Sequence, residues 1–253
     1  MSHFCEEMAL PSGPVVAAFQ PGDLGAPRRL CTRDELAFGG GGVIVADADH
    51  FYGHIVATGD LSGSYAVRED TELFFNAEIV RSDGILGAIG SSSLAPGHLS
   101  LGAMHAFAPL DNFGGALHGR LVLPTAIGVY QHGHPFGLDV GFTMAQPLVG
   151  RLYAHEDVTL FGQAVFGGGT GGLRGGVGVL AGVEWSAGKA FGLVGDVHAG
   201  FGYATAIDEV SIAPGFRFAG GKHFGAELSA LVPVVGRART PLAAADLRLS
   251  WRL

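Results

Sequence analysis

Charged residues are scarce in this sequence, and lysine is nearly absent. Asp, Glu, Lys and Arg together make up 15 % of the 253 residues, against about 25 % in an average globular protein. Lysine occurs only at Lys189 and Lys222, no basic run appears, and the formal net charge is -8. Because binding to a phosphate backbone needs clustered positive charge, the sequence argues against a nucleic-acid partner.

Long apolar runs are missing as well. Gly, Pro or a charge interrupts every apolar stretch before it reaches the roughly 18 residues of a membrane-spanning helix, which excludes helical membrane proteins. The chain is nevertheless apolar, with 48 % hydrophobic residues and a mean hydropathy of +0.35, and this excludes a disordered chain. The 43 glycines lack the period of three of collagen. A single all-β barrel can account for the whole length.

Only two cysteines are present, Cys5 and Cys31, and both lie in a proline-rich first stretch without regular alternation. A disulfide between them would fit an oxidising compartment such as a periplasm and would constrain this stretch by roughly 3 kcal/mol. The alternative is a pair of free thiols. Neither a basic n-region nor an apolar h-region follows Met1, so no signal peptide is visible, and an exported protein would be in its mature form. We call residues 1–33 the N-terminal arm.

Alternation of apolar and polar side chains dominates from about residue 34 to the end. In the last segment Leu247, Leu249 and Trp251 fall on one face, whereas Arg248 and Ser250 fall on the other. A period of two predicts β-strands. About twelve such segments occur, near 35–46, 54–66, 72–81, 97–109, 115–130, 137–149, 157–167, 173–186, 189–204, 209–218, 222–234 and 243–253. The expected fold is all-β: a closed antiparallel transmembrane β-barrel of about 12 strands over residues 34–253.

Alternation alone does not say which row of side chains points inward. In a soluble barrel such as a lipocalin the apolar row would fill the interior. The opposite row here is poor in charge, and Gly176, Gly178 and Gly182 would leave bare backbone facing water. The apolar rows also span roughly 9 to 11 positions, the length of a strand that crosses a bilayer. We therefore expect the apolar row to face lipid and the glycines and charges to face a lumen.

Aromatic residues near both ends of the segments agree with this orientation, because transmembrane barrels carry aromatic girdles at the two membrane interfaces. One group lies near the shorter turns and comprises Trp185, Phe191, Trp251, Tyr65 and Phe107; the other lies near the longer loops and comprises Tyr130, Tyr203 and Phe166. The alternative reading is the simple preference of aromatic residues for strands.

The alternating segments and the last strand, residues 247–253, resemble those of bacterial outer-membrane β-barrel proteins. This is a likeness of class, and no motif of a single family accompanies it. It implies a location in the bacterial outer membrane, contact with membrane lipids, and recognition of the last strand by the barrel-assembly machinery. The C-terminal Leu253 departs from the Phe that is usual in that class. The N-terminal arm is weakly similar to the plug segment of fatty-acid transporters, which makes it a candidate plug.

Thirteen ionisable residues are predicted to face the lumen. They are Asp60, Glu72, Glu78, Arg120, Asp139, Arg174, Glu184, Asp196, His198, Arg217, Glu227, Asp246 and Arg248. They could pair across the interior and close it, or line water and select solutes. Unpaired charges in a dry interior would cost several kcal/mol each, so the lumen must be wet or salt-bridged. The acidic majority would give a wet lumen a mild preference for cations.

No strong catalytic, cofactor or metal-binding motif appears in the sequence. Asp196 and His198 lie two apart on one strand and could form a dyad, with Ser229 or Ser100 as imaginable serine partners. A lipid-modifying enzyme is therefore one alternative, and a closed structural barrel is another. The favoured hypothesis is a porin-like channel, without enzymatic activity or cofactor, through which a small solute diffuses.

Overall fold

The computed structural model describes residues 32, 34–46, 53–85, 93–110, 113–125, 134–166, 172–187, 190–202, 207–220, 223–236 and 241–253. Cys5, Cys31 and most of the N-terminal arm lie outside these residues, so the disulfide stays a prediction. Within the described part, no helix is long and apolar enough to span a membrane.

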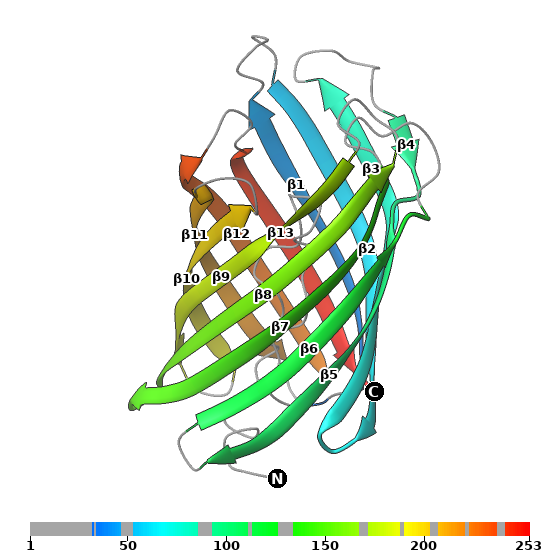
Figure 1. The fold of residues 1–253 in the computed structure, drawn as a ribbon. Helices are drawn as coiled ribbons and strands as arrows, with labels where there is room; N and C mark the ends of the chain where they lie inside the picture. Colours follow the sequence, from blue (N-terminus) through cyan, green and yellow to red (C-terminus); the bar gives the residue numbers. More distant parts are fainter. Residues whose placement is uncertain are drawn as a thin grey trace.

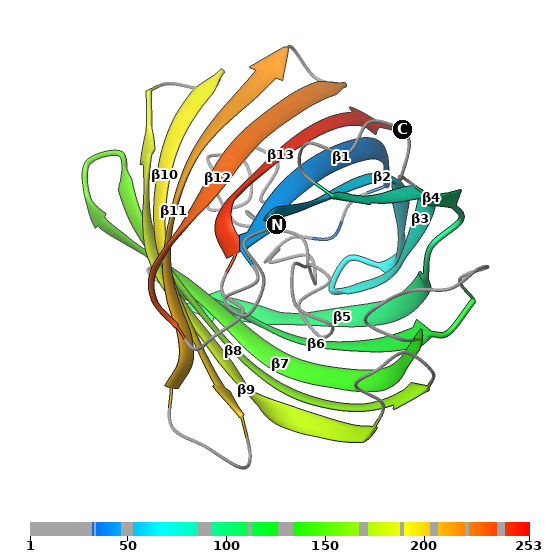
Figure 2. The same ribbon diagram turned by 90° about the horizontal axis from the view of Figure 1, so that it is seen from above.

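Strands account for nearly all of the described chain. They are β1 (Glu35–Ala46), β2 (Gly53–Arg68), β3 (Thr71–Ile85), β4 (Ser93–Ala95), β5 (Leu99–Leu110), β6 (Phe113–Leu123), β7 (His134–Val149), β8 (Leu152–Phe166), β9 (Gly172–Ser186), β10 (Phe191–Gly202), β11 (Ile207–Gly220), β12 (Phe224–Gly236) and β13 (Pro241–Arg252). Each long strand pairs antiparallel with its neighbours in the chain, and β1 pairs with β13. The twelve long strands of the described residues thus form a closed barrel (Figures 1 and 2), which confirms the predicted fold class.

Three details differ from the sequence prediction. Strand β6 ends at Leu123, whereas the predicted segment extends to residue 130. The three-residue strand β4 pairs with residues 81–83 of β3, beyond the part of β3 that pairs with β5, in a stretch that was predicted to be part of a long loop. Strand β8 begins at Leu152, five residues earlier than predicted, so that His155 and Glu156 lie in a strand rather than in a turn. Three consecutive ionisable residues at 155–157 resemble a turn in the sequence, but the pairing with β7 and β9 continues through them.

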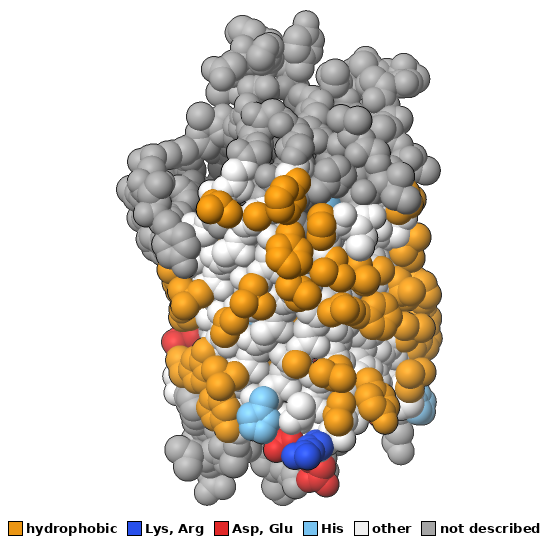
Figure 3. Space-filling model, turned by 45° about the vertical axis from the view of Figure 1, so that its right-hand side comes forward, with side chains coloured by type: hydrophobic (Ala, Val, Ile, Leu, Met, Phe, Trp, Pro, Cys, Tyr) orange, Lys and Arg blue, Asp and Glu red, His pale blue; other side chains and the backbone are white. Residues whose placement is uncertain are grey.

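The outer surface of the barrel is apolar. On β7, Leu138 and Val140 are exposed while Asp139 between them is fully buried, and on β12 Leu228 is 49 % exposed beside the buried Glu227. Figure 3 shows hydrophobic side chains over the middle of the face that it draws, with a group of acidic and basic side chains at its lower end. Exposed rows of apolar side chains around the barrel are typical of a barrel embedded in a membrane. This confirms the expectation that the apolar row faces outward.

Aromatic side chains gather where the strands approach the shorter turns. Trp185, Trp251 and Tyr65 are exposed there, and the Trp251 ring makes edge contacts with the rings of Phe38 and Phe224 on the two flanking strands. This contact group spans β1, β12 and β13 and has the character of an interfacial girdle. Of the predicted girdle at the opposite end, Phe166 is exposed, whereas Tyr130 and Tyr203 lie outside the described residues.

Candidate functional site

The inner wall of the barrel holds most of the ionisable residues that the sequence places in the lumen. Eight of them are buried: Glu72, Glu78, Arg120, Asp139, Glu184, Asp196, Arg217 and Glu227. Asp60, His198 and Arg248 are also on the inner rows and are partly buried. Arg174 and Asp246 lie in β9 and β13, but their side chains are not among those described. Whether these residues line a conducting pore stays a prediction.

Arg120 and Asp139 form an ion pair between directly opposed positions of β6 and β7. The guanidinium Nε of Arg120 donates to Asp139 Oδ2 at 2.9 Å, and its Nη2 donates to the same oxygen. Both side chains are almost completely buried. Because a buried charge without a partner costs several kcal/mol, each residue depends on the other to remain in the wall.

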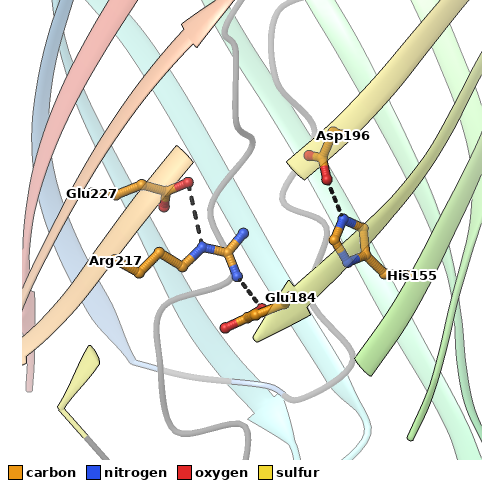
Figure 4. Close-up of polar contacts among 5 residues, drawn as sticks. All are labelled: His155, Glu184, Asp196, Arg217 and Glu227. Carbon is orange, nitrogen blue, oxygen red and sulfur yellow. Dashed lines mark hydrogen bonds and ion pairs between the residues drawn. The ribbon is translucent and has the colours of Figure 1, made fainter. Parts of the chain in front are cut away.

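Arg217, on β11, joins two carboxylates from different strands. Its Nη1 donates to Glu184 Oε2 on β9 at 2.7 Å, and its Nε lies 3.6 Å from Glu227 Oε1 on β12. Figure 4 shows the guanidinium between the two carboxylates. The three side chains are each at most 7 % exposed. The single positive charge of Arg217 balances only one of the two carboxylate charges, so an excess negative charge remains in this cluster.

His155 and Asp196 meet although a strand separates them. His155 is on β8 and Asp196 is on β10, and His155 Nε2 is 2.7 Å from Asp196 Oδ1 (Figure 4). The residue of β9 that stands between them in register is Gly182. A Cβ atom at Gly182 would lie 2.6 Å from His155 Nε2 and in contact with Asp196 Oδ1. The hydrogen bond exists only because the intervening residue has no side chain.

A related arrangement occurs at Gly141, which lies in register between His118 and Thr159. His118 on β6 reaches over Gly141 on β7 to Asp157 on β8, and its Nε2 is 2.9 Å from Asp157 Oδ2. A Cβ atom at Gly141 would collide with the His118 ring and lie 2.6 Å from the hydroxyl of Thr159. Asp157 also accepts hydrogen bonds from the Thr143 and Thr159 hydroxyls, at 2.6 and 2.7 Å.

A third glycine, Gly39, leaves room for a contact between side chains on either side of it, where the first and last strands of the barrel meet. Gly39 on β1 lies in register between Arg248 on β13 and Asp60 on β2. Arg248 Nη2 donates to Ser62 Oγ at 2.7 Å and lies 3.9 Å from Asp60 Oδ2. A Cβ atom at Gly39 would be 2.7 Å from Asp60 Oδ1. Arg248 therefore links the two strands that flank β1.

These six contacts, four between a guanidinium and a carboxylate and two between a histidine and a carboxylate, share one geometry, since each joins strands that are adjacent or separated by a single strand. They follow the curved wall and do not themselves bridge the bore. The three glycines provide the room in which the charged side chains lie flat against the backbone. Part of the glycine excess of the inner rows is thereby explained: it permits pairing between strands that are not neighbours.

The ionisable inner-wall residues that sequence analysis missed include Glu35, His118, His155 and Asp157. Alternation could have revealed His118, because it is two residues from Arg120 on the same strand. His155 and Asp157 were missed with the true start of β8. The proposed dyad partner of Asp196 was His198, and the hydrogen bond described above instead identifies His155 as a partner of Asp196.

A small cavity of about 20 Å³ lies in the wall between β1, β2, β3, β5 and β13. Carboxylates, hydroxyls, aromatic rings and one guanidinium line it, including Glu35, Glu72, Ser62, Phe74 and Arg248. Its size admits one water molecule and nothing much larger. No group of three or more His, Cys, Asp or Glu side chains in the described part of the chain is arranged to hold a metal ion.

The protein resembles known proteins in structure but not in sequence. No protein-family model matches the chain, and no curated protein matches it. An outer-membrane channel from Pseudomonas putida F1 superposes with a TM-score of 0.70 at 10 % identity, over 88 % of this chain and 96 % of that one. The fold is that of bacterial outer-membrane β-barrels.

Two porins have the same barrel fold. The NanC porin matches with a TM-score of 0.54 at 10 % identity, over 86 % of this chain and 98 % of its own. The KdgM porin matches with a TM-score of 0.54 at 8 % identity, over 87 % and 99 %. At such identities the likeness is one of fold, so what the outer-membrane barrel does must be argued from its own inner wall.

Proposed function

We propose that this outer-membrane barrel is a channel through which small solutes diffuse. The observation that carries the proposal is the course of the inner ion pairs, which run along the wall between near-neighbouring strands. A closed structural barrel would be better served by pairs that cross the interior, because those would fill it. The similarity in fold to an outer-membrane channel and to two porins supports the same function.

The inward direction of the ionisable residues also bears on the alternative of a lipid-modifying enzyme. Asp196, His155 and His198 all lie on inner rows, and the outer row of β10 consists of residues such as Leu193 and Val197, which are 46 % and 47 % exposed. A hydrolase that acts on membrane lipids needs its acid–base groups within reach of the acyl ester. The geometry therefore favours passage of a solute over hydrolysis of a lipid.

Single-channel recording in planar lipid bilayers tests the proposal. We expect discrete current steps from the purified, refolded barrel, with a conductance that rises with salt concentration, as diffusion through a hydrated lumen requires. A correctly folded protein that gives no steps at any applied voltage would refute the channel function and favour a closed structural barrel.

We further propose that the N-terminal arm narrows the channel. Thr32, immediately before the barrel, is buried, and its hydroxyl donates to the Glu69 carbonyl at 2.9 Å. Glu69 lies in the short connection between β2 and β3, so the arm joins the barrel at the end where the shorter turns lie. Deletion of residues 1–31, which keeps Thr32, is expected to raise the conductance of each step. Unchanged conductance would exclude a plug.

A further inference from the structure

The described inner wall carries far more carboxylates than guanidinium groups. The carboxylates on it are those of Glu35, Asp60, Glu72, Glu78, Asp139, Asp157, Glu184, Asp196 and Glu227, and the guanidinium groups are those of Arg120, Arg217, Arg248 and Arg252. Nine acidic groups thus face four basic ones on the described part of the wall. The imbalance is steeper than in the whole chain, which has 23 acidic and 15 basic residues.

Three of the four guanidinium groups are engaged by a carboxylate, and the fourth, that of Arg252, lies on β13 directly opposite Glu35 of β1. Arg120 is paired with Asp139, Arg217 lies between Glu184 and Glu227, and Arg248 lies 3.9 Å from Asp60 Oδ2. Four guanidinium charges can balance only four of the nine carboxylate charges, so negative charge is in excess on the described part of the wall. Other carboxylates have hydrogen bonds from neutral or titratable groups: Glu78 accepts from the His98 backbone N–H, and Asp157 accepts from two threonine hydroxyls.

Asp196 shows the surplus most directly. It is 1 % exposed, and His155 contacts its Oδ1. No hydrogen-bond donor among the described residues reaches its buried Oδ2. A charge set in a wall of low dielectric is screened less than one in water, and a cleft lined by one sign of charge concentrates counter-ions along its axis. These carboxylates can act on a passing ion without contacting it.

We infer that the channel selects small cations over anions, and that Asp196 and Glu72 contribute to the selectivity. The inference rests on the proposed channel function. Rings of acidic side chains are the usual basis of cation selectivity in pores. The same surplus disfavours an anionic solute, in contrast to the KdgM porin, which has been solved in complex with oligogalacturonate. The solute class expected here is inorganic monovalent cations and small amines.

The test is the reversal potential of the full chain in planar bilayers under a KCl gradient at pH 8, where ordinary histidines are neutral. We expect potassium to be several-fold more permeant than chloride at about 0.1 M salt. At 1 M salt the ratio should approach one, because the Debye length shrinks from about 10 Å to about 3 Å. A ratio at or below one at low salt, in a barrel that gives current steps, overturns cation selectivity alone. Absence of steps overturns the channel function and this inference with it.

Two variants and a matched control assign the selectivity to residues. Asp196→Asn and Glu72→Gln each remove one inner charge with little change in shape, and each should lower the potassium-to-chloride ratio. The control is Glu156→Gln, which removes the same charge from the exposed outer face of β8 and should leave the ratio unchanged. If one inner variant does not fold, the other still decides. If both inner variants have the same potassium-to-chloride ratio as the control, the selectivity does not come from Asp196 and Glu72.

Discussion

Replacement of Gly182 by alanine tests the idea that glycines on the inner wall exist to let charges pair across a strand. The new methyl group would occupy the space now used by the hydrogen bond between His155 and Asp196, lying 2.6 Å from His155 Nε2. Asp196 is 1 % exposed and cannot turn to water. Gly182→Ala therefore removes the partner of a buried carboxylate without altering either partner chemically.

The expected cost follows from the burial of the pair. Leaving a buried carboxylate without its hydrogen-bond donor costs about 1–3 kcal/mol, and more when the carboxylate is charged. The His155 side chain is 15 % exposed, so it can move partly into the lumen and relieve some of the clash. We therefore expect Gly182→Ala to lower the free energy of unfolding by about 2–4 kcal/mol.

Gly178→Ala is the matched control on the same inner row of β9. A Cβ atom at Gly178 would meet only the Thr159 carbonyl oxygen, at 3.9 Å, which is ordinary contact. Alanine there should be neutral or stabilising by up to about 1 kcal/mol, because it restricts the unfolded chain. Equilibrium unfolding in urea from lipid vesicles, followed by tryptophan fluorescence, measures both variants. Equal stability of the two would refute the role given to Gly182.

Two further pairs of substitutions address the orientation of the strands and the closure of the barrel. Leu228→Arg should cost about 2–4 kcal/mol in the same unfolding assay, because it places a charge in the lipid-facing row. Glu227→Gln should be tolerated, since Arg217 keeps its other carboxylate; equal damage at the two positions would contradict the assignment of faces. Arg248→Ala should cost about 1.5–3 kcal/mol, because the hydrogen bond from its charged group to Ser62 is lost. Ser62→Ala should cost less, and a reversed order would argue against a link across the first strand.

Much of the barrel could be predicted from the sequence because the strand period is local. Successive side chains of a strand point to opposite faces, so the alternation of Leu138, Asp139 and Val140 fixes two rows before any strand partner is known. The predicted segments 35–46 and 173–186 agree with β1 and β9 to within one residue at each end. The sequence also predicted which row faces the lumen, because glycines without side chains suit a lumen better than a water-exposed surface.

The start of β8 could not be predicted in this way. His155, Glu156 and Asp157 are consecutive and polar, which breaks the alternation of apolar and polar residues. Glu156 is exposed on the outer face whereas Asp157 is buried on the inner one, so the strand continues through an outward carboxylate. The start of β8 depends on hydrogen bonding with the neighbouring strands β7 and β9, which the local sequence pattern does not show.

The sequence by itself thus determined the twelve long strands apart from some of their ends, the two rows and the closed barrel, since each follows from a period of two and from the number of segments. Only the tertiary structure decided which charges meet. His155 and Asp196 are 41 positions apart in the chain, and their contact depends on the register of three strands and on a glycine in the middle one. Register is set by hydrogen bonding around the whole closed ring, and a shift of one residue in any strand would turn its charges from the lumen to the lipid.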